Sequence, residues 1–319
     1  MAITLHQVSY AYNSSGLWHQ GALHDINLTI SAGQFVGIAG SSGSGKSTLL
    51  QLFNGILKPS EGIVQVLDVM LQGVPDQDGK ARRNKQKKQK QPKLNELRKR
   101  VGLVFQFPEQ QLFEETVEKD LCFGPMNFGM SLEEAKERAS AAMVSMGLDL
   151  SLLQRSPFEL SGGQMRKVAI AMVLAMDPDI LVLDEPAASL DPVSRQELLQ
   201  LLEKLCRQEG KTVILVTHRM DEVLPLADRW ILLDQGQVSF EGTVKELVKR
   251  PECLVQAGLT IPASMQCWLT IAALHGLEDE EPCLSPSAMA GRIQRLLDEA
   301  KKKAAGTGGE EEALCAISC

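Results

Sequence analysis

The stretch Gly40-Ser41-Ser42-Gly43-Ser44-Gly45-Lys46-Ser47-Thr48 decides how this chain folds. The apolar residues 35–39 before it predict a buried strand, and residues 49–53 after it predict a helix. A strand, a glycine-rich loop, Lys-Ser and a helix together are typical of a phosphate-binding P-loop. The glycines let backbone N–H groups turn toward an anion at the helix N-terminus. Lys46 would then reach the β- and γ-phosphates, and the Ser47 hydroxyl would ligate Mg²⁺.

Composition limits the possible functions of the chain. It has 319 residues, of which 44% are hydrophobic, so it can form one large domain or two smaller ones. Its net charge of −7 argues against a general nucleic-acid binder, which relies on Lys and Arg. The seven cysteines include no CxxC pair, which favours a reducing compartment over a disulfide framework or a zinc site. We find neither a signal-peptide pattern nor a run of about 18 apolar residues, so membrane association is expected to depend on partners.

Two segments near the P-loop allow alternative readings. Residues 3–39 are predicted to be rich in β-strand. An aromatic residue in this region either stacks on an adenine ring or is a half-buried strand tyrosine. Tyr12 is the preferred candidate for stacking, ahead of Tyr10. Residues 76–95 form a basic insertion without acidic residues between Lys80 and Lys93. It could contact RNA or anionic lipid, but the absence of interleaved aromatic residues favours a solvated loop.

A second anion site is predicted downstream. The apolar strand 101–105 ends at Gln106, and residues 107–160 are predicted to form a mostly helical insertion. Leu160-Ser161-Gly162-Gly163-Gln164 then begins a helix that runs to about residue 176. Glycines and a serine at a helix N-terminus favour anion binding. Since one nucleotide does not need two such loops in one subunit, we expect this one to serve a nucleotide held by another copy.

Two further strands end in residues suited to phosphate chemistry. The apolar strand 180–183 leads into Asp184 and Glu185, at the sheet edge where open α/β sheets bind their ligands. Asp184 is placed to hold Mg²⁺ through water, and Glu185 to polarise an attacking water. His218 follows the strand 212–217, where it is either structural or in contact with a γ-phosphate.

The C-terminal part of the chain carries weaker signals. A hairpin is predicted over residues 230–240, with Gln235-Gly236 as its turn. Residues 251–300 suggest two or three short helices, the last over about 287–303, and the polar residues 306–319 suggest a disordered tail.

These motifs, in this order, resemble those of ABC-type ATPases. They are the Walker A loop (40–48), the Q-loop residue Gln106, the LSGGQ signature (160–164), the Walker B strand (180–185), the D-loop (189–191) and the switch residue His218. The resemblance covers about residues 1–245. It implies an α/β P-loop NTPase fold with a RecA-like core, an N-terminal antiparallel β subdomain, an α-helical subdomain (about 107–160) and a small C-terminal helical extension. The implied division is an ATPase domain (1–248), a helical dimerisation extension (249–304) and a tail (305–319).

The resemblance also implies a role for each motif residue. Glu185 and His218 would be catalytic, and Ser47, Gln106 and Asp184 would hold Mg²⁺. ATP would be bound by Tyr12, Gly40, Ser41, Ser42, Gly43, Ser44, Gly45, Lys46, Ser47, Thr48, Gln106, Ser161, Gly162, Gly163, Gln164 and Asp191. Two chains would form a head-to-tail dimer, with each ATP between the P-loop of one chain and the LSGGQ of the other. The sequence departs from the usual Thr-x-Gly pattern at Ala187-Ala188-Ser189, which concerns communication between the two sites.

A narrower resemblance is to the ATPases of energy-coupling factor transporters, and to the second of the two ATPase paralogues in particular. It rests on residues 104–113, 122–129 and 155–160. The implied partners are a second ABC ATPase subunit (a paralogue or a second copy), a transmembrane coupling subunit and a substrate-capture subunit, with no nucleic acid. The complex would take up a vitamin or a transition-metal ion, and this chain would lie at the cytoplasmic face of the cell membrane. Phe105 and Phe107 would lie near the surface that grips the coupling subunit. The alternatives are a conventional ABC importer or exporter and a soluble ABC ATPase without a transport role.

Overall fold

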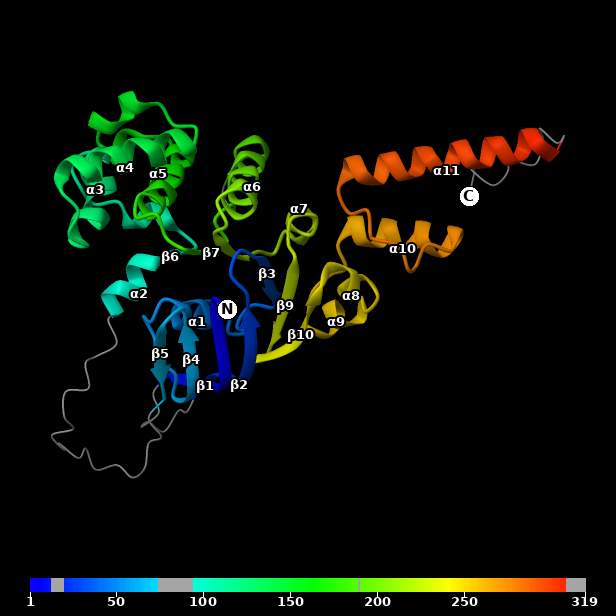
Figure 1. The fold of residues 1–319 in the computed structure, drawn as a ribbon, viewed down its shortest axis with the longest axis horizontal. Coiled ribbons are helices and arrows are strands. Elements are labelled where there is room, and N and C mark those ends of the chain that lie inside the picture. Colours follow the sequence, from blue (N-terminus) through cyan, green and yellow to red (C-terminus); the bar gives the residue numbers. More distant parts are fainter. Residues whose placement is uncertain (13–19, 74–93, 189, 308–319) are drawn as a thin grey trace.

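The computed structural model describes residues 1–12, 20–73, 94–188 and 190–307 (Figure 1). Most of the predicted basic insertion, Ser189 of the D-loop and the tail from residue 308 lie outside the described residues.

The central element is a sheet of six strands in the order β10-β9-β3-β8-β7-β6. All neighbouring strands in it are parallel except β10, which pairs antiparallel with β9. Its strands are β3 (Phe35–Gly40), β6 (Val101–Val104), β7 (Ile180–Asp184), β8 (Thr212–Val216), β9 (Arg229–Asp234) and β10 (Gln237–Thr243). Strands β3, β6, β7 and β8 are buried along their whole length, which explains their uninterrupted apolar sequences.

Alternate residues of these strands enter two separate cores. Leu181 and Leu183 of β7 pack with the helices of one face, whereas Ile180 and Val182 pack with α1 (Lys46–Phe53) on the other. This is the period of two expected for a strand covered on both faces. Because both faces are covered, only the ends of the strands are open to a ligand, as in other α/β folds.

A second sheet covers α1 on the side away from the parallel sheet. It is antiparallel, in the order β2-β1-β4-β5, and its buried residues share a core with α1. Its strands are β1 (Ile3–Tyr12), β2 (Gln20–Ile30), β4 (Glu61–Val66) and β5 (Val69–Gln72). The β-rich N-terminal region predicted from the sequence is therefore confirmed.

The helices between β6 and β7 form a cluster at one end of the molecule (Figure 1). They are α3 (Val117–Asn127), α4 (Leu132–Ser145) and α5 (Gly162–Leu174), with short 3-10 turns at Pro108–Gln111, Leu150–Gln154 and Pro157–Glu159. The short helix α2 (Leu94–Arg100) precedes β6, and α6 (Pro192–Arg207) follows β7. Ser131 and Glu134 form a capping box at the start of α4.

After β8 and α7, the described part of the chain continues with a hairpin and then four helices, up to residue 307. At the hairpin turn Gln235 and Gly236 have φ of 45° and 77°, the positive values that a tight two-residue turn requires. The helices are α8 (Val244–Val248), α9 (Glu252–Gln256), α10 (Ala263–His275) and α11 (Pro286–Thr307). The predicted last helix, over about 287–303, is present as α11, which has 22 residues and extends past the predicted end.

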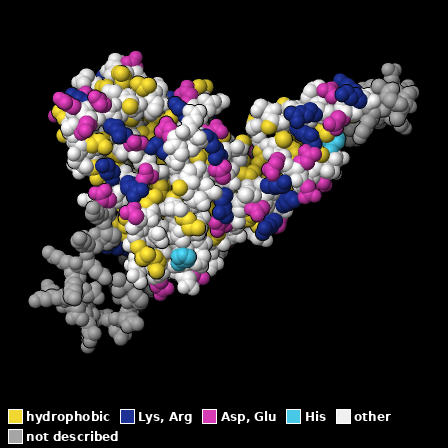
Figure 2. All heavy atoms as spheres, in the orientation of Figure 1, with side chains coloured by type: hydrophobic (Ala, Val, Ile, Leu, Met, Phe, Trp, Pro, Cys, Tyr) yellow, Lys and Arg dark blue, Asp and Glu magenta, His cyan; other side chains and the backbone are white. Residues whose placement is uncertain are grey.

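Helices α10 and α11 extend away from the body of the molecule (Figures 1 and 2). Asp221 of α7 (Met220–Val223) ties α10 to the body, because its carboxylate accepts hydrogen bonds from the Ser264 backbone N–H (2.8 Å) and the Ser264 hydroxyl (2.6 Å). None of the helices in the described ranges is both long and apolar enough to cross a membrane.

Candidate functional site

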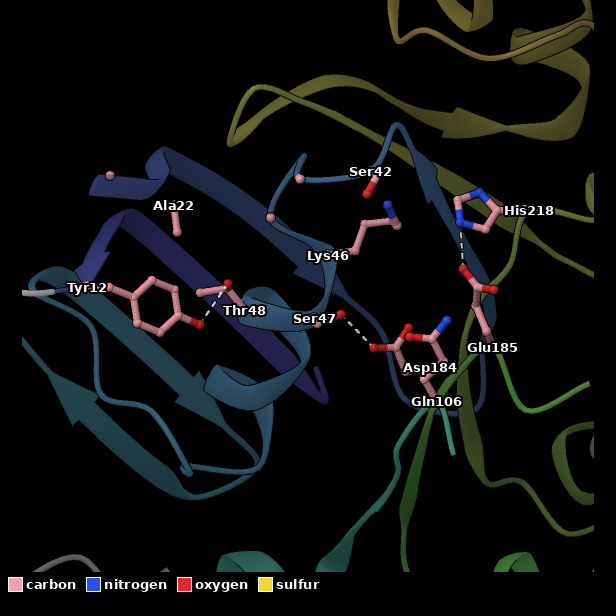
Figure 3. A pocket seen from close by; sticks show the side chains of 13 residues that line it. Tyr12, Ala22, Ser42, Lys46, Ser47, Thr48, Gln106, Asp184, Glu185 and His218 are labelled. Carbon is pink, nitrogen blue, oxygen red and sulfur yellow. Dashed lines mark hydrogen bonds and ion pairs between the residues drawn. The ribbon is translucent and has the colours of Figure 1, made fainter. Parts of the chain in front are cut away.

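A cavity of about 420 Å³ lies beside the P-loop, at the carboxyl end of the parallel sheet. Residues from β1, β2, the P-loop, α1 and the loops after β6, β7 and β8 surround it (Figure 3). Its lining residues are Tyr12, Gly21, Ala22, Ser42, Gly43, Gly45, Lys46, Ser47, Thr48, Gln106, Asp184, Glu185 and His218. The structure thus brings together most of the predicted nucleotide, metal and catalytic residues.

The P-loop ends in an uncapped helix that faces this cavity. Gly45, the N-cap of α1, has φ 99°, and no side chain caps the helix. A Cβ at Gly45 would lie 2.6 Å from the Ala22 carbonyl oxygen, so both backbone conformation and space require glycine here. The first N–H groups of a helix have no intrahelical partner, and those of α1 remain available to an anion.

Lys46 is the cation of the cavity, and its side chain is only 8% exposed. Its Nζ donates hydrogen bonds to the carbonyl oxygens of Gly40 (2.9 Å) and Ser41 (2.8 Å) and lies 3.4 Å from the Ser44 hydroxyl. These three P-loop residues, also predicted to bind ATP, are not among the lining residues and instead hold Lys46 in place. Burial lowers the pKa of Lys46, while the nearby carboxylates of Glu185 and Asp184 oppose this shift.

Three oxygen-bearing side chains meet next to the lysine. The Ser47 hydroxyl donates a hydrogen bond of 2.6 Å to Asp184 Oδ2, and Gln106 lies beside them (Figure 3). Mg²⁺ prefers oxygen ligands and is usually held by one or two carboxylates, waters and substrate phosphates. The predicted ligand set of Ser47, Gln106 and Asp184 fits this preference. Among the described residues no group of three or more His, Cys, Asp and Glu side chains could enclose a metal by itself.

Glu185 and His218 form an acid–imidazole pair at the same end of the cavity (Figure 3). His218 Nε2 lies 2.6 Å from Glu185 Oε1. The Glu185 side chain is 16% exposed and that of His218 is 50% exposed, so the carboxylate is the more desolvated partner. Glu185 has φ 47°, in the left-handed region that non-glycine residues rarely occupy. Such backbone conformations cluster at functional sites.

Tyr12 borders the opposite side of the cavity. The residue is 40% exposed, and its hydroxyl lies 3.1 Å from the Thr48 hydroxyl (Figure 3). Tyr10 is more buried and packs edge-on against Tyr12, with 5.0 Å between ring centroids, so Tyr12 alone of the two lines the cavity. Gly21 and Ala22 of β2 also line it, and sequence reasoning missed them. The available signal was a glycine within a strand, which often marks a close approach of another group.

The predicted signature residues and Asp191 do not line this cavity. Ser161 is the N-cap of α5 and forms a capping box with Gln164, so these two side chains bind each other's backbone N–H groups. A Cβ added to Gly162 or Gly163 would meet nothing within 4 Å. Asp191 caps α6 by accepting hydrogen bonds of 3.0 Å from the backbone of Val193 and Ser194. Within this chain, Gly162 and Gly163 of the signature face open space.

The sequence and the structure are similar to those of known proteins. Residues 23–188 match the ABC transporter family. The energy-coupling factor transporter ATP-binding protein EcfA2 of Listeria monocytogenes is 49% identical over 263 residues, covering 82% of this chain and 86% of that protein. The protein of the same name from Bacillus cereus is 43% identical over 297 residues, covering 93% of this chain and 97% of that protein.

Two solved structures share the fold. One is the dimeric ATP-binding cassette MJ0796 in a post-hydrolysis state with ADP and Pi, at 32% identity and a TM-score of 0.65, covering 76% of this chain and 98% of that one. The other is cbiO1 of Clostridium perfringens, part of the ABC transporter complex cbiONQ. It is 34% identical with a TM-score of 0.64, and the match covers 83% of this chain and 97% of that one.

Proposed function

The chain belongs to the ABC transporter family of ATP-binding proteins, and we propose that it is the ATP-hydrolysing subunit of an energy-coupling factor transporter. The observation that carries the catalytic part is the cavity in which Lys46, Ser47 and Asp184 lie beside the pair of Glu185 and His218. The P-loop and Lys46 bind the phosphates, and Ser47, Gln106 and Asp184 would hold Mg²⁺, which when bound would supply charge neutralisation at the phosphates. Glu185 orients and deprotonates the attacking water, and His218 holds the Glu185 carboxylate.

The assignment to this type of transporter rests on similarity over nearly the whole chain. The relative from Bacillus cereus matches 93% of it, including most of the region that follows the ATPase domain. The substrate is then a vitamin or a transition-metal ion that another polypeptide captures. In this assignment residues 249–304 form the dimerisation extension of an ATPase domain at 1–248, which lies at the cytoplasmic face of the membrane.

A groove on the helical cluster supports contact with a membrane subunit. The groove, of about 380 Å³, lies along α3 and α4 and includes Phe123, Met126 and Leu132, each 45–51% exposed. Phe113 packs edge-on against Phe123 at its border and is 57% exposed. Apolar side chains are interspersed with charged ones over this end of the molecule (Figure 2). Exposed aromatic groups of this kind are typical of protein interaction sites, and an apolar helix of a coupling subunit fits here.

The open signature supports a head-to-tail dimer. Gly162 and Gly163 have ample space for a side chain and ordinary backbone φ, so the fold of one chain does not require glycine at either position. Glycine at a helix N-terminus allows close approach of an anion. In the dimer this anion is the ATP held by the P-loop of the second ATPase subunit.

Gly163→Asp should therefore impair catalysis without impairing folding. We expect hydrolysis to fall about tenfold or more, because the added charge repels the phosphates of the facing nucleotide. Thermal unfolding and nucleotide binding by the free chain should stay close to those of wild type. The control is Ala141→Asp, which adds the same charge on an exposed site of α4. Full hydrolysis by Gly163→Asp in the assembled complex would contradict the head-to-tail arrangement.

The transport assignment is tested by affinity purification of the tagged chain from detergent-solubilised membranes of its own organism. We expect a small hydrophobic coupling protein, a substrate-capture protein and either a second ATPase or another copy of this chain in the eluate. Phosphate release by the eluate should depend on Mg²⁺. Recovery with the permease subunits of a conventional ABC transporter, with ribosomes or with DNA would overturn the transporter assignment while leaving the ATPase assignment in place.

A further inference from the structure

Arg166 of α5 is a buried charge outside the cavity. Its side chain is 1% exposed, which places it among the largest fully buried side chains of the described residues. Its Nη2 donates a hydrogen bond to the backbone carbonyl of Gln106, and its Nε lies 3.5 Å from Glu109 Oε2. Nε and Nη1 have no hydrogen-bond partner among the described residues. A buried guanidinium with so few partners carries a large desolvation penalty, so packing alone does not explain an arginine here.

The acceptor of this hydrogen bond is a residue of the candidate site. Gln106 lies in the irregular segment between β6 and the 3-10 turn Pro108–Gln111, and its side chain is exposed and lines the cavity. Among the described residues, the hydrogen bond to the Gln106 carbonyl comes from Arg166. The amide of Gln106 lies beside Asp184 (Figure 3), and the backbone of Gln106 is held by α5, the helix that begins with the signature.

We infer that Arg166 is a positioning residue. It fixes Gln106 at the end of the cavity where Ser47 and Asp184 lie, the proposed Mg²⁺ site. It also links this site to α5, the helix that begins with the signature. An arginine suits the role because its planar guanidinium presents several N–H groups at once: here Nη2 donates to the Gln106 carbonyl while Nε lies in an ion pair, 3.5 Å from the Glu109 carboxylate. A lysine in the same place would offer a single point of contact. Through this link, a displacement of α5 in one chain shifts Gln106 in that chain's own cavity. The inference rests on the proposed ATPase function of this cavity.

The test compares Arg166→Gln and Arg166→Lys with wild type in the assembled complex. The readouts are kcat and the Mg²⁺ concentration that gives half-maximal hydrolysis. Removing a residue that orients a metal ligand typically costs about tenfold to a hundredfold in metal affinity or activity. We expect the Mg²⁺ requirement of Arg166→Gln to rise by about tenfold, with Arg166→Lys intermediate. Binding of ATP without Mg²⁺ should stay unchanged.

Arg98→Gln is the control. Arg98 also donates a hydrogen bond to a backbone carbonyl, that of Gly55, but it lies away from the cavity.

A double variant separates positioning from a general structural role. If Arg166 acts through Gln106, Arg166→Gln should have little further effect on the Mg²⁺ requirement in a Gln106→Ala background. Additive effects of the two substitutions, or an unchanged Mg²⁺ requirement in both Arg166 variants, would overturn the inference. If the Arg166 variants fail to fold, Glu109→Gln takes their place, because the Glu109 side chain is 26% exposed and its substitution should be tolerated. This variant should also raise the Mg²⁺ requirement. An unchanged Mg²⁺ requirement would overturn the inference. A wild-type complex without ATPase activity would instead contradict the proposed function.

Discussion

Replacing Glu185 with glutamine is expected to abolish nearly all ATP hydrolysis while leaving ATP binding intact. The amide keeps the shape of the side chain. Its oxygen can still accept a hydrogen bond from His218 Nε2, which in the wild-type chain lies 2.6 Å from Glu185 Oε1. It cannot take a proton from water at neutral pH. Loss of a general base typically lowers the rate by about a hundredfold to ten-thousandfold. Steady-state phosphate release should fall in this range, and the affinity for a fluorescent ATP analogue should be unchanged or higher because one negative charge near the γ-phosphate is gone.

The control for this substitution is Glu133→Gln. Glu133 is an exposed residue of α4, so the same chemical change there should not affect hydrolysis. If Glu185→Gln retained more than about a tenth of the wild-type rate, Glu185 would not be the general base. A fall in kcat with equal loss of ATP affinity would point instead to a disturbed cavity, since removal of an interaction made only in the transition state lowers kcat alone.

The sequence alone predicted the parts of the site that lie next to regular elements. Lys46 and Ser47 follow a glycine-rich loop. Its backbone conformation requires glycine, as the φ of 99° at Gly45 illustrates, and this requirement can be recognised from the local sequence. Asp184 and Glu185 end a strand, and the carboxyl ends of neighbouring parallel strands meet at one edge, so their proximity to the P-loop followed from topology. The 2.6 Å contact between Ser47 and Asp184 confirms this proximity.

Other features depend on contacts that no local pattern encodes. Ala22 reaches the cavity because β2 passes beside the P-loop, where the Ala22 carbonyl limits the space at Gly45. Arg166 resembles a surface residue of a helix in the sequence, and only the packing of α5 against the segment after β6 shows that it is buried and bound to Gln106. The predicted end of the last helix at 303 is four residues early, because Ala304 and Ala305 are strong helix formers that continue α11.

Lys46→Met is expected to weaken nucleotide binding about a hundredfold. The substitution keeps an unbranched side chain, one atom shorter, but deletes the cation that the Gly40 and Ser41 carbonyls hold beside the cavity. Hydrogen bonds to charged groups contribute about 1.5–3 kcal/mol each, so losing the lysine's contacts to the phosphates should cost about 3 kcal/mol, or about a hundredfold in Kd. Lys58→Met, on an exposed residue after α1, makes the same chemical change away from the cavity and should bind as wild type does.

The weaker binding of ATP by Lys46→Met can be measured as a smaller stabilisation of the chain by ATP in thermal unfolding. At an ATP concentration of about 100 times the wild-type Kd, binding stabilises the wild-type chain by about 2.7 kcal/mol. With Kd raised about a hundredfold, the same concentration stabilises Lys46→Met by only about 0.4 kcal/mol, so its melting temperature should barely respond to ATP. The nucleotide-free variant should unfold close to wild type, because deleting the buried ammonium removes a desolvation penalty as well as its bonds to two carbonyls. A nucleotide-free chain that is already unfolded would assign the lysine a structural role. A full ATP response would show that the P-loop amides bind the phosphates without Lys46.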